Sequence, residues 1–239
     1  MQTAGQPKPA ASRGAAERLV WDLPLRVTHW LIVITIAGAW ATHYAGTRWF
    51  AWHRTLGCAT LVLVAFRIAW GFVGTRHARF ATFLRGPRAV SAYVRERPRR
   101  PTVGHNPLGA LSVVAMLATL LVQAATGLFA NDGIANAGPF YGWIAPATSN
   151  RISGLHEANS TVLLALVVLH VLAIAWYGRV AGQPLTRAML TGRKPATEVP
   201  PDASIADSRT VLALVIVVAL ALLLALAIRA APDATIALY

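Results

Sequence analysis

The chain has 239 residues, of which 56% are hydrophobic and only 13% are charged; a soluble globular domain has about a quarter charged residues, so the composition excludes an ordinary soluble fold. The formal net charge of +13 would suit nucleic acid, yet Lys and Arg also hold the loops of membrane proteins on the cytoplasmic side. The single cysteine, Cys58, excludes an intrachain disulfide, and without a Cys-x-x-Cys-His motif a covalently attached haem is excluded too.

Residues 1–19 contain no apolar stretch of signal-peptide length, so we expect a cytoplasmic tail there. Five later segments are long and apolar enough to cross a bilayer, because about 20 residues span its hydrocarbon core. Each must be helical, since backbone groups find no water inside a membrane. The expected spans are Thr28–Ala45, Thr55–Val73, Leu108–Ala130, His156–Tyr177 and Thr210–Ile228.

The connections divide the chain further. The segment Asn131–Leu155 contains glycines, prolines and small polar residues, so we expect a loop. A four-helix domain is expected over residues 20–194, a cytoplasmic linker over 195–208, and a fifth helix with a short periplasmic tail over 209–239. The expected fold class is an all-α integral membrane protein, a four-helix transmembrane bundle with an added C-terminal transmembrane helix.

The distribution of Lys and Arg predicts the orientation. Seventeen of them flank one side of the five expected spans and four flank the other, while Arg67 lies within a span. Basic residues favour the cytoplasmic side, so the amino terminus is expected in the cytoplasm and the carboxyl terminus outside. The same asymmetry explains the charge without a nucleic-acid partner.

Histidines inside spans are candidates for function, because a buried imidazole without a partner is costly in lipid. His156 and His170 lie 14 residues apart on one expected helix. At 100° and 1.5 Å per residue they share a face to within about 40° and stand about 21 Å apart along the axis. Such an arrangement suits two stacked cofactors.

Topology supplies the opposite ligands. His29 and His170 are expected near the cytoplasmic side, and His53 and His156 near the outer side. Facing helices of a bundle can place histidines on both axial positions of a haem iron. The sequence therefore predicts two non-covalently bound b-type haems per chain.

One outer ligand has an alternative. His43, 14 residues after His29, could replace His53. We favour His53, because Gly57 follows one turn later and a glycine lets a flat macrocycle approach the backbone. Small residues also let membrane helices pack closely. A glycine in a span can therefore indicate either clearance for a haem or close packing of two helices, and both interpretations stay open here.

Arg67 lies 14 residues after His53, on the same helix face and at the depth of the inner haem. A buried guanidinium needs an anion, and a haem propionate is one; the alternative is a side chain that snorkels to the cytoplasmic surface. His77 and His105 fall in or beside the basic loop, and we expect them to be solvated.

The chain resembles the bacterial cytochrome b561 family, which includes the b-type cytochrome subunits of nickel–iron hydrogenases. The resemblance covers about Val20 to Lys194 and rests on the four histidines above and on the segments VWDLPLRVTHW (20–30), HRTLG (53–57), FRIAWG (66–71), GHNP (104–107) and TGRK (191–194). It implies the same ligand pairs, a bacterial inner-membrane location, and electron exchange with quinone and a partner redox protein. The fifth span lies outside the family core.

Three functions follow as hypotheses. The first is electron transfer between the quinone pool and a periplasmic c-type cytochrome or hydrogenase-like enzyme, with a homodimer left open. The second is a superoxide oxidase that reduces quinone, although such an enzyme needs a positive outer funnel and few cations lie outside. The third is a non-haem transition-metal membrane protein, although no carboxylate lies deep within a span.

Overall fold

The computed structural model of the protein describes residues 16–96 and 102–232. Most of the expected cytoplasmic tail and the end of the periplasmic tail lie outside these residues. So do five of the basic residues counted for the orientation, namely Lys8, Arg13, Arg97, Arg99 and Arg100.

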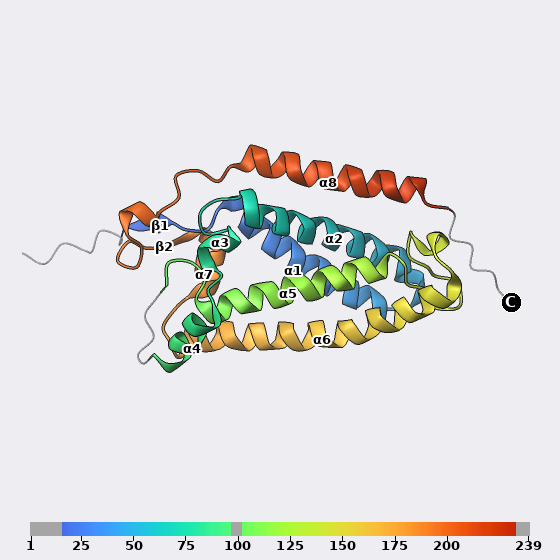
Figure 1. The fold of residues 1–239 in the computed structure, drawn as a ribbon, viewed down its shortest axis with the longest axis horizontal. Helices are drawn as coiled ribbons and strands as arrows, with labels where there is room; N and C mark the ends of the chain where they lie inside the picture. Colours follow the sequence, from blue (N-terminus) through green and yellow to red (C-terminus); the bar gives the residue numbers. More distant parts are fainter. Residues whose placement is uncertain (1–15, 97–101, 233–239) are drawn as a thin grey trace, which may run out of the picture.

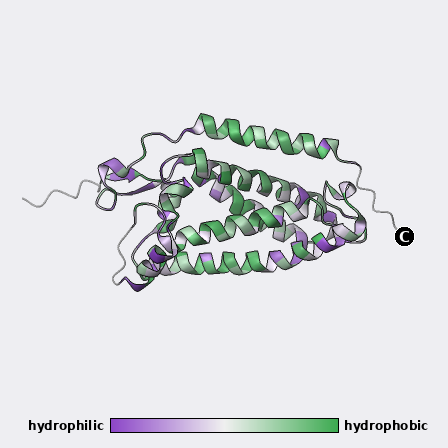
Figure 2. Cartoon of the chain, in the orientation of Figure 1, coloured by the Kyte–Doolittle hydropathy of each residue, from purple (hydrophilic) through white to green (hydrophobic). Residues whose placement is uncertain are grey.

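Five long helices dominate the described chain, and all five are long and apolar enough to cross a membrane. They are α1 (Leu23–Tyr44), α2 (Phe50–Val73), α5 (Pro107–Gly127), α6 (Pro146–Arg179) and α8 (Thr210–Ala230). They run side by side along the long axis of the molecule (Figure 1). Their residues are mainly hydrophobic, whereas hydrophilic residues gather toward the ends (Figure 2). The expectation of a helical, multi-pass membrane protein is confirmed.

The helix starts follow from local chemistry. The Asp22 carboxylate caps α1 by accepting from the Leu25 amide at 2.7 Å, and the Asn106 side chain accepts from the Gly109 amide at 2.7 Å at the start of α5. The helix α6 begins at Pro146, a residue that fits a first turn because it has no amide hydrogen to lose.

The prediction of a loop over Asn131–Leu155 is therefore wrong for residues 146–155, which are helical. Their sequence, PATSNRISGL, is polar enough to look like loop. It nevertheless continues the helix beyond the apolar stretch, where side chains need not suit lipid. His156 consequently lies well inside α6 rather than at its start.

The helices pack in sequence order, α1 on α2, α2 on α5 and α5 on α6. A cluster of buried side chains, Val64, Leu117, Leu120 and Leu163, joins α2, α5 and α6. In the described part of the chain, no comparably close backbone packing joins α6 to α1 or α2. The space between α6 and these two helices is therefore bridged by side chains alone.

One end of the molecule carries the smaller elements α3 (Phe80–Phe83), α4 (Pro87–Arg95), α7 (Leu185–Thr191), β1 (Glu17–Leu19) and β2 (Arg193–Pro195) (Figure 1). The strands β1 and β2 pair antiparallel, with Arg18 opposite Lys194. Gly192 allows this pairing, because its φ is 79° and a Cβ there would lie 2.6 Å from the Trp21 carbonyl oxygen. The two ends of the segment that resembles a known family are thus joined.

The expected linker over residues 195–208 packs against this end. Val199 and Ala203 are buried in a cluster with Trp21, Phe66 and Trp70. The helix α8 lies beside α2 and touches α1, and most of its surface stays exposed (Figure 1). The segment before α8 is therefore packed against the rest of the chain rather than free of it.

Asp22 is fully buried and ties α1 to the far end of α2. Besides capping α1, its carboxylate accepts from Trp70 Nε1 at 3.1 Å and from Thr75 Oγ1 at 2.5 Å. Hydrogen bonds to a charged acceptor in a buried site are among the stronger ones in proteins. The carboxylate therefore fixes the register of the first two long helices.

Replacing Asp22 with alanine should lower the free energy of unfolding by about 3 kcal/mol, because the cap and two buried donors lose their acceptor. Unfolding of the purified protein in detergent, followed by circular dichroism, measures the loss. Asp207→Ala, which removes an exposed carboxylate outside this network, is the control. If the two variants were equally stable, the proposed role of Asp22 would be wrong.

Candidate functional site: two facing histidine pairs

The end of the bundle that carries α3, α4 and α7 is called the basic end here, because most of the Lys and Arg residues lie in its connections. The first pair joins α1 and α6 at this basic end. The rings of His29 and His170 face each other with their centroids 6.4 Å apart and their planes at 51°. The Nδ1 atom of His29 is buried and has no hydrogen-bond partner among the described residues. Two helices that do not otherwise pack closely thus present imidazoles across a gap.

The second pair joins α2 and α6 near the other end. The rings of His53 and His156 also have their centroids 6.4 Å apart, with their planes at 84°. His43 is exposed, and its ring lies 5.9 Å from that of His53 rather than opposite His156. The geometry therefore favours His53 over His43 as the residue that faces α6.

Hydrogen bonds orient the second pair. The Nδ1 atom of His53 lies 2.9 Å from the Ala39 carbonyl oxygen on α1, and Nδ1 of His156 lies 3.0 Å from the Gln123 carbonyl oxygen on α5. If Nδ1–H donates in both rings, Nε2 is left with a lone pair for a metal. Such outer hydrogen bonds commonly fix the tautomer of a ligating histidine.

The dimensions of both pairs fit a haem iron. Because a metal–imidazole bond is about 2 Å, a metal between two facing rings separates their centroids by roughly 6 Å. Gly57, half-buried on α2 one turn beyond His53, would have nothing within 4 Å of an added Cβ. This open space beside the second pair is where a flat macrocycle needs clearance.

Arg67 does not snorkel to the surface. The residue is only 6% exposed, and its Nη1 atom is buried without a hydrogen-bond partner among the described residues. Its guanidinium carbon lies 5.3 Å from the centre of the Phe80 ring. The attraction between the cation and the ring offsets part of the free-energy cost of burying the charge. The unpartnered nitrogen fits an anionic group such as a propionate.

A polar network beside His156 was missed by sequence reasoning. The Gln123 amide lies 3.1 Å from His156 Nε2, Asn159 donates to the Gln123 side-chain oxygen at 2.7 Å, and Thr126 Oγ1 lies 3.1 Å from His156 Nδ1. Metal coordination through Nε2 would replace the contact with the Gln123 amide. Polar residues inside expected spans are the sequence signal that could have revealed this network.

Two other glycines in the spans, Gly38 and Gly127, serve close packing. A Cβ on Gly38 would lie 2.9 Å from Leu56 Cδ1, and one on Gly127 would lie 3.0 Å from His156 Cε1. Gly38 therefore brings α1 and α2 together, and Gly127 makes room for the His156 ring. Of the three glycines, Gly57 alone has an open Cβ position.

The expectation that His77 and His105 are solvated is wrong. His77 Nε2 lies 2.7 Å from the Ala203 carbonyl oxygen, and His105 Nδ1 is buried without a hydrogen-bond partner among the described residues. Burial, with the positive charge of Arg67 and Lys194 nearby, lowers the pKa of His105 to about 3. Burial also lowers the pKa of His77. The basic loop folds back over the bundle end, so its histidines lose water.

No group of three or more His, Cys, Asp or Glu side chains suited to a bare metal ion occurs within residues 16–96 and 102–232. The histidines come in pairs instead, as a haem with axial imidazoles requires. The site thus has the features of a membrane b-type cytochrome.

Comparison with known proteins supports this class. A sequence model of the prokaryotic cytochrome b561 family matches residues 20–192, and the chain belongs to that family. Membership implies a b-type haem and a role in membrane electron transport.

The chain is also similar to proteins named probable Ni/Fe-hydrogenase B-type cytochrome subunit. It is 25% identical to the protein of Azotobacter chroococcum mcd 1 and 26% identical to that of Azotobacter vinelandii. Each alignment is 219 residues long, and it covers 77% of this chain and 90% of the relative. The protein of Rhodobacter capsulatus is 24% identical over 213 residues, which cover 73% of this chain and 80% of the relative.

The open space at Gly57 can be tested with a matched pair of variants. Gly57→Leu should remove about half of the bound haem, because the side chain would fill the clearance beside His53 and His156. Gly154→Leu, on α6 with an equally open but exposed Cβ position, should retain the wild-type content. The pyridine haemochrome assay measures the haem content per chain. Equal haem content in the two variants would contradict the assignment of the space at Gly57 to a haem.

Proposed function

We propose that the protein is a di-haem b-type cytochrome that carries electrons across the bacterial inner membrane, between the quinone pool and a periplasmic redox partner. The observation that carries this proposal is the pair of facing imidazole sets with the same centroid separation of 6.4 Å. Their members on α6 are 14 residues, or about 21 Å, apart along the helix. Two sites at that separation cover most of a hydrocarbon core about 30 Å thick.

Each residue has a role in holding the cofactors. His29 and His170 are the proposed axial ligands at the basic end, and His53 and His156 are those at the other end. Bound haem supplies one-electron iron chemistry, tuned by its axial ligands and surroundings. Arg67 balances the charge of an inner propionate, and Gly57 gives clearance for the outer macrocycle.

The chain also insulates the electron path. The buried cluster of Val64, Leu117, Leu120 and Leu163 fills the bundle between α2, α5 and α6 with apolar side chains. Water is therefore kept from the middle of the bundle. The proposed domain division follows from this arrangement, with residues 20–194 as the cytochrome, 195–208 as the connection and 209–239 as the added transmembrane helix with its tail.

The orientation and partners complete the proposal. The excess of Lys and Arg at one side supports a cytoplasmic amino terminus and a periplasmic carboxyl terminus. A quinone reaches the chain through the bilayer. The names of the relatives support a hydrogenase-like enzyme as the periplasmic partner. A c-type cytochrome is the alternative partner, because its haem also exchanges single electrons.

Ligand variants should separate the two haem sites. His170→Ala and His53→Ala should each lower the haem content from two per chain to one, since each removes one axial ligand of a different pair. His43→Ala should keep both, because His43 is exposed and does not face His156. Reduced-minus-oxidised visible spectra with quantified haem give the answer. Loss in His43→Ala instead of His53→Ala would move the outer ligand to α1.

Electron transfer itself can be measured in proteoliposomes that contain the full chain. Ubiquinol or menaquinol in the bilayer should reduce ferricyanide confined to the side that holds the carboxyl terminus. His29→Ala and His156→Ala should each slow this flow at least tenfold, because each interrupts one of the two sites. A two-haem protein that reduced ferricyanide no faster than empty liposomes would contradict the proposed function while leaving the haem assignment intact.

A further inference from the structure

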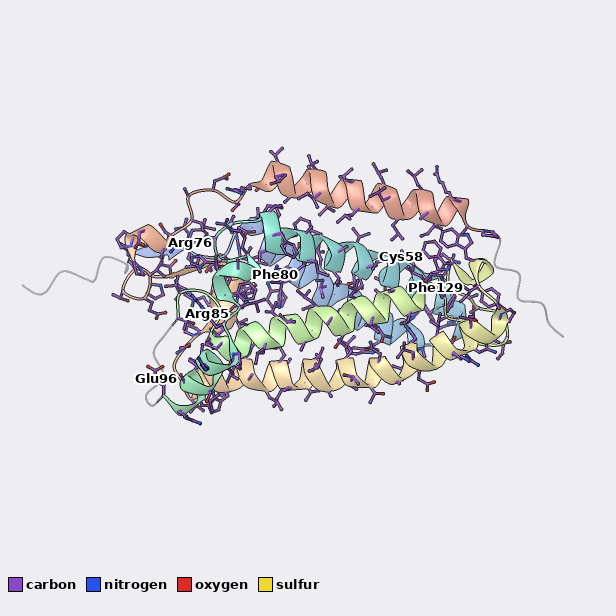
Figure 3. The ribbon with its side chains drawn as sticks, viewed as in Figure 1. Cys58, Arg76, Phe80, Arg85, Glu96 and Phe129 are labelled. Atoms are coloured by element: carbon purple, nitrogen blue, oxygen red, sulfur yellow. The ribbon has the colours of Figure 1, made fainter. Side chains whose placement is uncertain are left out.

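A half-open cavity of about 510 Å³ lies at the basic end of the bundle. It is formed by the segment from the end of α2 through α3 and by the residues that lead into α5. Arg76 and Arg85, which line it, lie at the end of the molecule where α3 and the two strands gather (Figure 3). None of the proposed haem ligands lines this cavity.

The mouth of the cavity is cationic. Arg76 and Arg85 are both exposed, and among the residues that form the cavity no Asp or Glu occurs. Arg76 donates to the Asp202 carbonyl oxygen at 2.7 Å, and among the described residues Arg85 makes only a 3.4 Å hydrogen bond to the Thr82 carbonyl oxygen. Because a guanidinium has five N–H donors, most of them stay available to a ligand.

The inner wall of the cavity is aromatic and backed by polar groups. His105 lines the cavity, and its ring lies 4.7 Å from that of Trp21 and 4.5 Å from that of Phe83. Its buried Nδ1 has no partner among the described residues. Lys194 donates to the carbonyl oxygen of Thr102, which also lines the cavity, at 2.8 Å. The buried ammonium thereby adds a positive charge behind the wall.

The segment around the cavity has the composition of a membrane surface. From Arg76 to Arg95 the sequence contains five arginines and no acidic residue. Leu84 is 42% exposed next to the cavity, and the short helix α4 that follows carries Arg88 and Arg95 among apolar residues. A helix of that kind lies at the boundary between headgroups and acyl chains. Both a phosphate and the first part of an acyl chain would find complementary surface there.

We propose that this cavity binds the phosphate group of an anionic phospholipid from the membrane leaflet at the basic end of the bundle. Basic pockets at the cytoplasmic side of membrane proteins are suited to such headgroups. Arg76 and Arg85 supply the charge, and the exposed Leu84 beside the cavity lies against the apolar part of the lipid. The site depends on the membrane location of the chain and not on its redox partner.

The test uses the purified, haem-loaded full chain in a neutral detergent, with dioleoyl phosphatidylglycerol as the probe and native mass spectrometry as the readout. The double variant R76Q/R85Q should bind the lipid about 30-fold more weakly, because each arginine that lines the cavity and contacts the phosphate contributes roughly a factor of five. The control R88Q/R95Q loses the same charge from exposed positions of α4 that do not line the cavity. It should bind within about twofold of the wild type.

Three results would overturn the proposal: equal weakening in both double variants, equal binding of dioleoyl phosphatidylcholine, or displacement of the lipid by millimolar inorganic phosphate. The last would assign the cavity to a free anion instead. An unchanged haem spectrum in the variants serves as the folding control. Should the double change disturb the fold, Arg85→Gln alone is expected to weaken binding about fivefold, and normal binding by that folded variant would overturn the proposal equally.

Discussion

Hydrocarbon offers neither donors nor acceptors, and this shortage governs how the chain is built. Inside the spans, Thr60 Oγ1 lies 2.8 Å from the Leu56 carbonyl oxygen and 2.9 Å from the Thr35 hydroxyl, and the Gln123–Asn159 network is closed between neighbouring helices. Against this background, His29 Nδ1 and Arg67 Nη1 are exceptions, as are Arg26 Nε and Trp30 Nε1 on α1, because they are buried without partners among the described residues. Unsatisfied polar atoms in such a place indicate where a bound group belongs.

Much of this arrangement could be predicted from sequence because the bilayer leaves few choices. Apolar length defined five helices, and the 14-residue interval between His156 and His170 placed both on one face. The interval works because α6 is continuous from Pro146 to Arg179. Which histidine of α1 or α2 faces His156 could not be settled by spacing, since that choice depends on how the helices rotate against one another.

Outside the hydrocarbon the sequence was less informative. The polar residues 146–155 are helical, because a helix that has already been nucleated extends at little cost. His77 and His105 are covered because Val199, Ala203 and the chain around them fold back onto the bundle end. These contacts join residues more than 120 positions apart, as in the bond from His77 to Ala203. No local pattern contains that information.

The pairing of β1 with β2 has a consequence for how the protein is made. Glu17 pairs with Pro195, so strand β1 waits for a partner that is synthesised 178 residues later. At about 5–20 residues per second, that delay is roughly 10–35 seconds. In the later part of this delay α1 and α2 have been synthesised, while β2 has not. The insertion machinery, or a partner already in the membrane, therefore has a window of many seconds in which to engage the unfinished bundle.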